Sequence, residues 1–256
     1  MKDLKNKNIW IIGASSGIGA ALARELAHRG ARVALSARRE EKLEEVKRKL
    51  SGDNHLVLPL DVTNVEKLEQ NVEALDKEFG RIDSVIFLAA IYAPHENERK
   101  DLDFIHKILN VNIGGAYNVG ETMFKYYKDK DYGQIVLCGS VAGYRGLPQG
   151  QPYCSTKAAI ISYAESLKVE AGANGTEVKL ICPGFVETPL TNKNDFDMPF
   201  IISAEKAASY IADGLVKKSF EIHFPKVFTF AVKALKFLPY PLYFLIANKM
   251  LRKFDI

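Results

Sequence analysis

Short apolar runs alternate with helical patterns along most of this chain of 256 residues. Each run is almost continuously apolar, whereas the segments between the runs carry apolar residues at helical spacing. Strands of this kind are typical of a parallel sheet that helices cover on both faces and that right-handed crossovers connect. The predicted strands span residues 9–12, 32–36, 56–60, 84–88, 134–138, 177–182 and 221–224, and predicted helices between them include 20–28, 40–50 and 65–79.

This alternation predicts an α/β protein, a single-domain doubly wound Rossmann fold with a mostly parallel seven-stranded sheet. A chain of this length with 47% hydrophobic residues can bury one substantial core. We expect residues 1–225 to form this domain and residues 226–256 to form a basic, aromatic and helical extension. A fold of this class binds its ligand at the carboxyl ends of the strands, near the point where the strand order reverses.

The cysteine spacing and the N-terminal residues indicate the cellular compartment of the protein. Cys138, Cys154 and Cys182 have no paired or metal-like spacing, which favours a reduced intracellular setting. The first residues lead straight into the first predicted strand, without an apolar segment long enough for a signal peptide, so we expect a cytoplasmic protein. The five histidines have no metal-binding or catalytic spacing. We therefore expect no metal site, and we expect no nucleic-acid partner.

A glycine-rich turn, Gly-Ala-Ser-Ser-Gly-Ile-Gly, follows the first predicted strand at residues 13–19. Glycines allow backbone torsions that other residues avoid, and they let the chain approach a pyrophosphate. The helix that follows directs free N–H groups and the positive end of its dipole at such an anion. Taken alone, the turn could also be an ordinary strand-to-helix connection. The predicted cofactor-binding residues here are Gly13, Ser15, Ser16, Gly17, Ile18 and Gly19.

Three residues with complementary chemistry, Ser140, Tyr153 and Lys157, follow the fifth predicted strand. A loop rich in glycine and proline separates the serine from the tyrosine, and a helical pattern begins at Ser155. The spacing of four residues places Tyr153 and Lys157 about one helical turn apart on the same side. An ammonium group could then lie beneath a phenol.

The same Tyr-x-x-x-Lys spacing recurs at Tyr126 and Lys130. This second pair lies in a polar stretch that is typical of the charged end of a helix. We interpret it as a solvated face, so the spacing alone does not mark a site.

Together with the glycine-rich turn, Ser140, Tyr153 and Lys157 resemble the short-chain dehydrogenase/reductase family, over roughly residues 7–225. The spacing Gly-x-x-x-Gly-x-Gly matches the family's form of the turn. The resemblance implies an enzyme that transfers hydride between a nicotinamide and a carbonyl or secondary alcohol of a small molecule. It also implies a homodimer or homotetramer that pairs through two long helices. The alternative is a non-catalytic NADP-binding protein that uses this fold for interaction or redox sensing.

The resemblance implies further site residues. Asn112 matches a helix asparagine that holds a water against the catalytic lysine, and its neighbour Asn110 is the competing candidate. After the fourth strand the family usually reads Asn-Asn-Ala-Gly, but residues 88–91 here read Leu-Ala-Ala-Ile, so Ile91 narrows the passage beside the cofactor. The other implied cofactor-binding residues are Asp61, Val62, Ala89, Ala90, Pro183, Gly184, Val186 and Thr188, together with Tyr153 and Lys157.

Two arginines, Arg38 and Arg39, follow the second predicted strand. An acidic residue at this place would bind the ribose hydroxyls of NAD, whereas a guanidinium can pair with the 2′-phosphate of NADP. No carboxylate precedes Glu40 after this strand, so the sequence favours NADP(H) over NAD(H), with Arg38 as the better candidate. The alternative is that both arginines simply begin a solvated helix.

Hydride transfer to a carbonyl carbon leaves negative charge on the oxygen, which must then receive a proton. We expect Tyr153 to act as the general acid and base, because an ammonium at Lys157 would lower the pKa of the phenol from its ordinary value of about 10. Ser140 would hydrogen-bond the substrate oxygen. Asn112 would help connect Lys157 to solvent.

Residues 186–203 lie where the family places its mobile substrate lid. The side chains of Phe196, Met198, Phe200 and Ile201 in this segment suggest an apolar or amphipathic substrate, such as a lipid-derived, steroid-like or fatty-acyl carbonyl compound.

The C-terminal extension combines aromatic and basic residues and has no acidic residue from 226 to 254. It could cover the substrate entrance, pack on its own domain or a dimer partner, or lie on the inner face of a membrane as a peripheral contact. Its apolar run at residues 237–247 is too short for the roughly 20 residues that cross a bilayer. The basic residues are Lys226, Lys233, Lys236, Lys249, Arg252 and Lys253.

Overall fold

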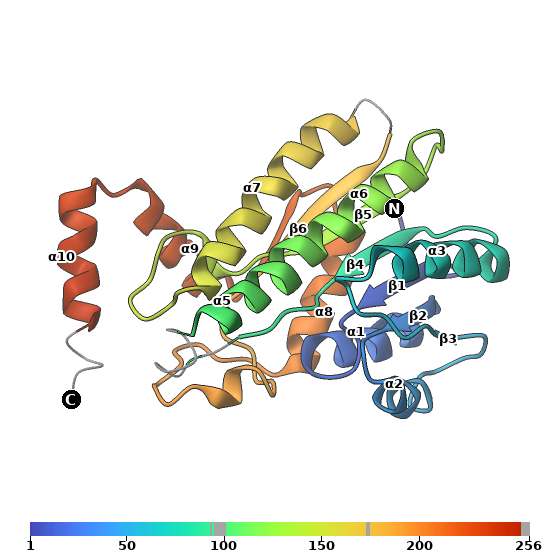
Figure 1. Ribbon diagram of the computed structural model, residues 1–256, viewed down its shortest axis with the longest axis horizontal. Helices are drawn as coiled ribbons and strands as arrows, with labels where there is room; N and C mark the ends of the chain where they lie inside the picture. Colours follow the sequence, from blue (N-terminus) through green and yellow to red (C-terminus); the bar gives the residue numbers. More distant parts are fainter. Residues whose placement is uncertain (93, 95–100, 173–174, 252–256) are drawn as a thin grey trace.

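Seven parallel strands form one sheet at the centre of the protein (Figure 1). The structure is a computed structural model that describes residues 1–92, 94, 101–172 and 175–251. The strand order is β3-β2-β1-β4-β5-β6-β7, and all neighbouring strands are parallel. The doubly wound α/β prediction is therefore confirmed. The strands are β1 (Asn8–Ile12), β2 (Arg32–Ser36), β3 (Leu56–Val57), β4 (Ser84–Phe87), β5 (Gln134–Cys138), β6 (Glu177–Pro183) and β7 (Glu221–Phe224).

Strand β3 is shorter than the predicted strand at 56–60. The chain beyond it still follows β2, since the N–H of Leu58 donates to the carbonyl of Leu35 at 2.9 Å and that of Leu60 to the carbonyl of Ala37 at 3.0 Å. Pro59 lies between these two donors and has no N–H of its own. Because position 59 faces the open edge of the sheet, a proline there removes no hydrogen bond to β2.

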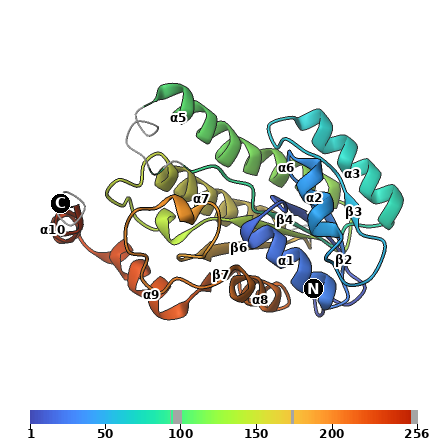
Figure 2. The ribbon, with the colours of Figure 1, turned by 90° about the horizontal axis from the view of Figure 1, so that it is seen from below.

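Helices cover both faces of the sheet (Figure 2). Alternate residues of β1 show the division, because Ile9 and Ile11 belong to the core that includes α1, α2 and α8, whereas Trp10 and Ile12 belong to the core that includes α3, α6 and α7. All four side chains are fully buried. The helices are α1 (Gly17–His28), α2 (Glu40–Lys47), α3 (Val65–Phe79), α5 (Leu102–Leu109), α6 (Gly115–Tyr127), α7 (Tyr153–Ala171) and α8 (Ala204–Leu215).

Strand β1 lies between β2 and β4, so the connections on its two sides run in opposite directions across the sheet. The loops that follow β1 and β4 therefore diverge, which leaves space above the carboxyl ends of these strands. Turns after β2, β5 and β6 open at the same edge because the whole sheet is parallel. This edge is where the fold can hold a ligand.

After β7 the chain forms α9 (Lys226–Ala234), a 3₁₀ turn (Leu235–Phe237) and α10 (Tyr240–Leu251). Helix α9 packs on β7, where Nδ1 of His223 and the hydroxyl of the buried Thr229 lie 2.6 Å apart. Helix α10 lies farther from the sheet, at one end of the molecule (Figure 1). Across the described part of the chain, no helix combines the length and the apolar character that a membrane span needs. Arg252 and Lys253 lie outside the described residues.

Candidate active site

A cavity of about 290 Å³ lies at the carboxyl ends of the strands. Its walls come from the segments that follow β1, β2, β3, β4, β5 and β6, which are far apart in the sequence. Every residue that the sequence assigns to cofactor binding lines this cavity, while the roles themselves remain predictions. These residues are Gly13, Ser15, Ser16, Gly17, Ile18, Gly19, Arg38, Arg39, Asp61, Val62, Ala89, Ala90, Tyr153, Lys157, Pro183, Gly184, Val186 and Thr188.

The turn from β1 into α1 brings the backbone at three glycines to the cavity wall, beside Ser15, Ser16 and Ile18. Gly13 and Gly17 have φ angles of +99° and +53°, in the region that favours glycine. A Cβ atom at Gly13 would lie 2.6 Å from the backbone nitrogen of Ala89, and one at Gly17 would lie 3.1 Å from Cβ of Thr188. The first turn of α1 thus reaches the cavity with backbone N–H groups that have no partner within the helix. A phosphate group fits such a place.

Charged groups gather where the segments after β2 and β3 meet the cavity. Arg38 and Arg39 are exposed and follow β2. Thr63 donates its N–H to Oδ1 of Asp61 at 3.0 Å and its hydroxyl to the same oxygen at 2.7 Å. The backbone hydrogen bond from Thr63, its hydroxyl and the positive charge of Arg38 hold the pKa of Asp61 below its ordinary value, against the effect of burial. Arg38 and Asp61 are therefore electrostatic neighbours at this end.

Ser140, Tyr153 and Lys157 come together in the cavity wall. Helix α7 begins at Tyr153, two residues before the helical pattern in the sequence. Lys157 is buried, and its Nζ donates to the carbonyl of Cys138 at 2.8 Å and lies 5.5 Å from the centre of the Tyr153 ring. Ser140 follows β5, and its Oγ accepts a hydrogen bond of 3.1 Å from the N–H of Ala142. The end of β5 and the start of α7 thus fix all three groups.

The ionisation of Tyr153 differs from the expectation. Burial raises the pKa of its phenol above the ordinary value, two neighbouring thiols and Tyr92 raise it further, and the hydrogen bond with Ser140 lowers it. Burial also lowers the pKa of Lys157. Burial therefore sets the net direction of the Tyr153 pKa shift, which is upward and not downward, while the role of Lys157 toward this phenol stays a prediction. The phenol is protonated at neutral pH.

Asn112 lies behind the cavity wall, which its neighbour Val111 lines. It is fully buried in a π-helical turn (Asn110–Gly114) that joins α5 to α6. Oδ1 of Asn112 accepts from the N–H of Ile91 at 2.8 Å, and its Nδ2 donates to the carbonyl of Ile91 at 3.0 Å and to the hydroxyl of Thr156 at 3.2 Å. The competing candidate, Asn110, is exposed. Asn112 therefore ties the segment after β4 to α7, one residue from Lys157.

The second Tyr-x-x-x-Lys pair is separate from this cavity, which neither of its residues lines. Tyr126 lies at the end of α6, where its hydroxyl hydrogen-bonds the carboxylate of Asp76 on α3. Nζ of Lys130 lies 4.2 Å from the centre of the Tyr126 ring. The interpretation of this pair as a solvated face is wrong for Tyr126, whose ring is half-buried against the neighbouring helix.

Several residues of the cavity wall have no binding role predicted from the sequence, although Ile91 was expected to narrow the passage beside the cofactor. Most follow a strand end or adjoin a residue that was assigned, so position in the fold was the signal that could have found them. They are Ile12, Ala37, Leu60, Leu88, Ile91, Val111, Cys138, Gly139, Pro189, Leu190 and Thr191.

Tyr92 is a further residue of the site that sequence reasoning missed. Its ring stands edge-on to that of Tyr153, with the ring centres 5.0 Å apart. Its hydroxyl donates to Oδ1 of Asn194 at 2.8 Å, in the loop between β6 and α8. Nδ2 of Asn194 lies 3.2 Å from Sδ of Met198 in the same loop. The segment after β4 and the loop after β6 therefore meet beside Tyr153.

The loop between β6 and α8, at residues 184–203, closes at its base. The N–H of Glu187 donates to the carbonyl of Ile202 at 2.9 Å, and the N–H of Ile202 donates to that of Phe185 at 3.2 Å. Four phenylalanines pack at its outer side, with ring centres 5.5 to 5.9 Å apart in consecutive pairs. One of them comes from α9, so the C-terminal extension contacts the loop. This aromatic cluster consists of Phe196, Phe185, Phe228 and Phe200.

Known proteins share this arrangement of motifs and fold. The family model of the short chain dehydrogenases matches residues 7–198. An uncharacterized oxidoreductase of Myxococcus xanthus is 31% identical over 252 residues, which cover 98% of this chain and 100% of that protein. The 3-oxoacyl-acyl-carrier-protein reductase FabG of Haemophilus influenzae is 32% identical over 188 residues, which cover 73% of this chain and 77% of that protein.

A solved structure has the same fold. A short chain dehydrogenase from Burkholderia cenocepacia, crystallised in complex with NADP, aligns with a TM-score of 0.78. The alignment covers 93% of this chain and 100% of that one, at 21% sequence identity.

Proposed function

The chain belongs to the short-chain dehydrogenase family and is an oxidoreductase, and we propose that it transfers hydride between NADP(H) and a carbonyl or secondary alcohol of an apolar substrate. The observation that carries the proposal is the meeting of two predicted sites in one cavity. The glycine-rich turn and Ser140, Tyr153 and Lys157 all line its wall.

The residues present fit a dinucleotide. A Cβ at Gly13 would lie 2.6 Å from the backbone nitrogen of Ala89, so only a glycine lets the turn pack against this segment. The start of α1 then lines the cavity, where its free N–H groups can meet a pyrophosphate. Arg38 would pair with the 2′-phosphate and Asp61 would contact the adenine. The related Burkholderia fold in complex with NADP supports this choice of cofactor. When bound, the nicotinamide supplies the hydride.

The residues of the cavity wall would then supply the proton that the substrate oxygen needs during reduction. Tyr153 would donate its phenolic proton to the developing alkoxide in the reducing direction, since burial keeps the phenol protonated. Ser140 would hydrogen-bond the substrate oxygen. Lys157, whose Nζ donates to the carbonyl of Cys138, would stabilise the phenolate that remains after the transfer. Asn112 would hold the segment after β4 against α7 and help connect Lys157 to solvent.

The loop after β6 supports an apolar or lipid-like substrate. Its aromatic cluster joins the loop to α9, and Val186, Leu190 and Thr191 of the same loop line the cavity. The resemblance to FabG, a reductase of acyl-carrier-protein substrates by its name, agrees with a fatty-acyl carbonyl compound. We place the non-catalytic alternative second, because a protein that only binds the cofactor has no need for Ser140, Tyr153 and Lys157 together in one cavity wall.

Assembly and location complete the proposal. We propose that two long helices, α7 and the continuous α5–α6 segment, pair with those of a second copy to give a homodimer or homotetramer. They lie side by side on one face of the sheet (Figure 1). Val169 on α7 is 81% exposed. The enzyme would work in the cytoplasm, peripheral to the inner face of a membrane that its C-terminal extension contacts.

A screen of ketones and aldehydes tests the function. The purified protein should oxidise NADPH in the presence of medium-chain or bulky apolar carbonyl compounds, followed at 340 nm, about the absorbance maximum of the reduced nicotinamide. The same assay with Tyr153→Phe is the control for adventitious reduction. Tight binding of NADPH without turnover of any carbonyl or alcohol would favour the non-catalytic alternative.

A further inference from the structure

Helix α10 has two apolar faces. Tyr243 and Ala247, four residues apart, are 5% and 9% exposed and face the body of the protein. Leu242, Leu245 and Ile246 follow the spacing i, i+3, i+4 on the opposite side and are 52%, 62% and 39% exposed. A helix that only packs on its own domain needs a single apolar face. The outer face of α10 therefore requires a separate explanation.

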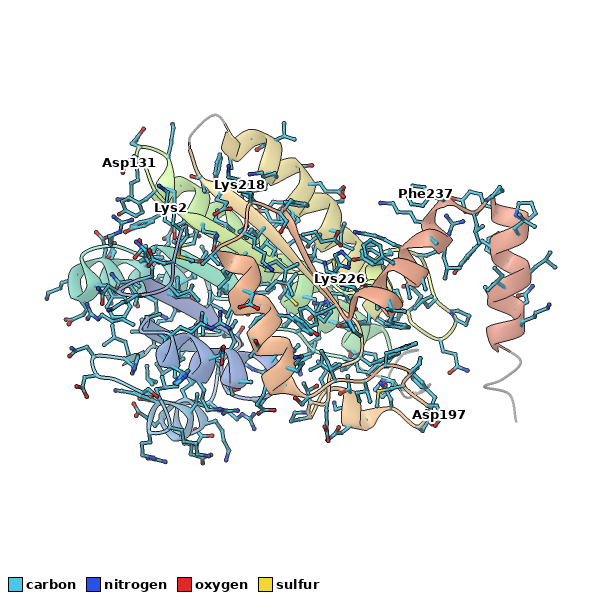
Figure 3. The ribbon with its side chains drawn as sticks, turned by 180° about the vertical axis from the view of Figure 1, so that it is seen from behind. Lys2, Asp131, Asp197, Lys218, Lys226 and Phe237 are labelled. Atoms are coloured by element: carbon cyan, nitrogen blue, oxygen red, sulfur yellow. The ribbon has the colours of Figure 1, made fainter. Side chains whose placement is uncertain are left out.

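Basic and aromatic residues extend this outer face. Lys249 continues the same spacing at i+7, and Lys236 lies in the turn before α10. Phe237, beside Lys236, is 83% exposed and lies at the outer end of the molecule, where α9 passes into α10 (Figure 3). No acidic residue occurs from 226 to 251. We call the set Lys236, Phe237, Leu242, Leu245, Ile246 and Lys249 the docking surface.

The segment that carries the docking surface contacts the loop between Ser140 and Tyr153, at residues 141–152, which we call the catalytic loop. Arg145 lies between Ser140 and Tyr153, and its guanidinium donates to the carbonyls of Lys236 at 3.2 Å and Leu238 at 3.4 Å. The same guanidinium lies over the rings of Tyr240 and Tyr243, 4.8 and 4.3 Å from their centres. The hydroxyl of Tyr243 donates to the carbonyl of Gly146. These contacts fix the inner face of α10 and leave the outer face turned away from the protein.

We propose that the docking surface binds the anionic surface of a lipid membrane, with α10 lying in the plane of the interface. Leu242, Leu245 and Ile246 would enter the boundary between headgroups and acyl chains, while Lys236 and Lys249 pair with anionic headgroups. Helix α10 has 12 residues, so it reaches only about 18 Å and lies on the bilayer without crossing it. This inference rests on the proposed location and gives it a residue-level basis.

The charge of the docking surface favours a lipid over a second copy of the chain. Two copies that paired through α10 across a two-fold axis would bring Lys236 and Lys249 of each chain toward those of the other, with no carboxylate in the segment to neutralise them. An anionic bilayer supplies the missing negative charge. It also receives the apolar side chains that water would otherwise surround.

Because α9 and α10 lie beside loops of the proposed active site, binding to a membrane could bring an apolar substrate to that site. Phe228 of α9 packs against Phe185 and Phe200 of the loop after β6, 5.5 and 5.9 Å between ring centres. Gly184 of this loop lines the cavity and lies against the Phe228 ring. A protein that lies on a bilayer through α10 would therefore bring this part of the loop close to the lipid. A lipid-like carbonyl compound would reach the site without crossing bulk water.

Co-sedimentation with vesicles tests the proposal. The intact protein should sediment with vesicles of phosphatidylglycerol and phosphatidylcholine, and at least about tenfold less with pure phosphatidylcholine. High salt should release part of the bound protein, since screening weakens the lysines and not the apolar contact. The double variant Leu242→Ser/Leu245→Ser should lower binding about tenfold or more. Val65→Ser, at an apolar position of α3 that is 43% exposed and lies outside both the docking surface and the proposed pairing helices, is the control and should bind as the unaltered protein does.

Two results would overturn the proposal. One is an intact protein that stays in the supernatant with anionic vesicles. The other is a Leu242→Ser/Leu245→Ser variant that binds vesicles normally but elutes as a smaller species in gel filtration, because the outer face would then serve a second copy. NADPH oxidation with a soluble carbonyl compound, measured on the same samples, reports separately on the proposed activity and on correct folding of each variant.

Discussion

Tyr92 stands edge-on to Tyr153, with the ring planes at 66° and the ring centres 5.0 Å apart. Tyr92 also donates its hydroxyl proton to Oδ1 of Asn194 at 2.8 Å. Nζ of Lys193 lies 3.5 Å from the carbonyl of Tyr92, so two successive residues of the loop after β6 contact it. The position of this loop is thereby coupled to the position of the proposed catalytic phenol.

We expect Tyr92→Phe to lower kcat/KM about three- to tenfold, mainly through a higher KM. The variant keeps the ring beside Tyr153 and loses the hydrogen bond to Asn194, which contributes about 1 kcal/mol. Steady-state kinetics of Tyr92→Phe, Asn194→Ala and the double variant form the test. If the two effects simply add, the hydrogen bond between Tyr92 and Asn194 has no role in substrate binding.

Arg38→Asp should weaken NADPH binding by about 10- to 100-fold and leave NADH binding equal or better. A guanidinium paired with the 2′-phosphate is a charge-assisted contact, whereas a carboxylate repels that phosphate. Fluorescence titration with both cofactors measures the change. Arg24→Asp, which alters a partly buried arginine on α1 that pairs with Glu205 outside the cavity, controls for the change in net charge. Equal affinities of the unaltered protein for the two cofactors would contradict the assignment.

Tyr153→Phe should lower kcat by at least about 100-fold with little change in NADPH affinity. The lost hydroxyl acts on the developing alkoxide and contributes little to holding the pyrophosphate. Tyr126→Phe is the control, and we expect normal turnover together with a loss of about 1 kcal/mol in the free energy of unfolding, because its hydroxyl bonds Asp76. If Tyr126→Phe abolished turnover and Tyr153→Phe did not, the assignment of the general acid to Tyr153 would be wrong.

Carbonyl reduction should keep its rate through neutral pH, and alcohol oxidation should rise as the pH approaches about 9 to 10. Burial raises the pKa of Tyr153, so the phenol holds the proton needed for reduction and only slowly gains the phenolate needed for oxidation. Both rates, measured at saturating substrate between about pH 6 and 10, provide the test. A reduction rate that halves near pH 7 would show that another group, or a Tyr153 with a depressed pKa, donates the proton.

Glu177→Gln should lower the free energy of unfolding by about 1.5–3 kcal/mol at pH 7, the cost of a lost hydrogen bond to a charged group. Burial alone would raise the pKa of Glu177, but hydrogen bonds from Lys179 at 2.9 Å and Gln134 at 2.7 Å lower it overall. A carboxyl group with a depressed pKa stabilises the fold above its unfolded value of about 4.3 and loses that contribution as the pH falls through its folded value.

The difference in stability between Glu177→Gln and the unaltered protein should therefore shrink below about pH 4. Urea denaturation at several pH values measures it. Glu165→Gln, at an exposed position on α7, should leave stability within about 0.5 kcal/mol at every pH. A constant difference across the range would assign the effect of Glu177 to packing.

The strands and the cavity residues next to them could be predicted because they depend on local pattern. Ile9 and Ile11 point to one core and Trp10 and Ile12 to the other, so β1 appears in the sequence as a continuous apolar run. The turn at Gly13 could be predicted for the same reason, since its conformation is a property of a few adjacent residues.

Contacts between distant segments could not be predicted in this way. Tyr92 belongs to no motif, and its place beside Tyr153 depends on how the segment after β4 meets α7. The direction of the Tyr153 pKa shift depends on burial in the folded cavity, which spacing does not reveal. The half-buried ring of Tyr126 depends on α3, about 50 residues earlier in the chain.

The side-chain amide of Asn112 occupies both hydrogen-bonding groups of the Ile91 backbone. These two hydrogen bonds resemble those that a neighbouring strand would make. They hold the backbone beyond the carboxyl end of β4 and so fix the direction of the segment that follows. Because the Asn112 amide contacts only main-chain atoms of residue 91, these hydrogen bonds do not depend on the side chain at that position. Position 91 can therefore carry a bulky isoleucine in the cavity wall, in place of the family's glycine, while both hydrogen bonds to Asn112 are kept.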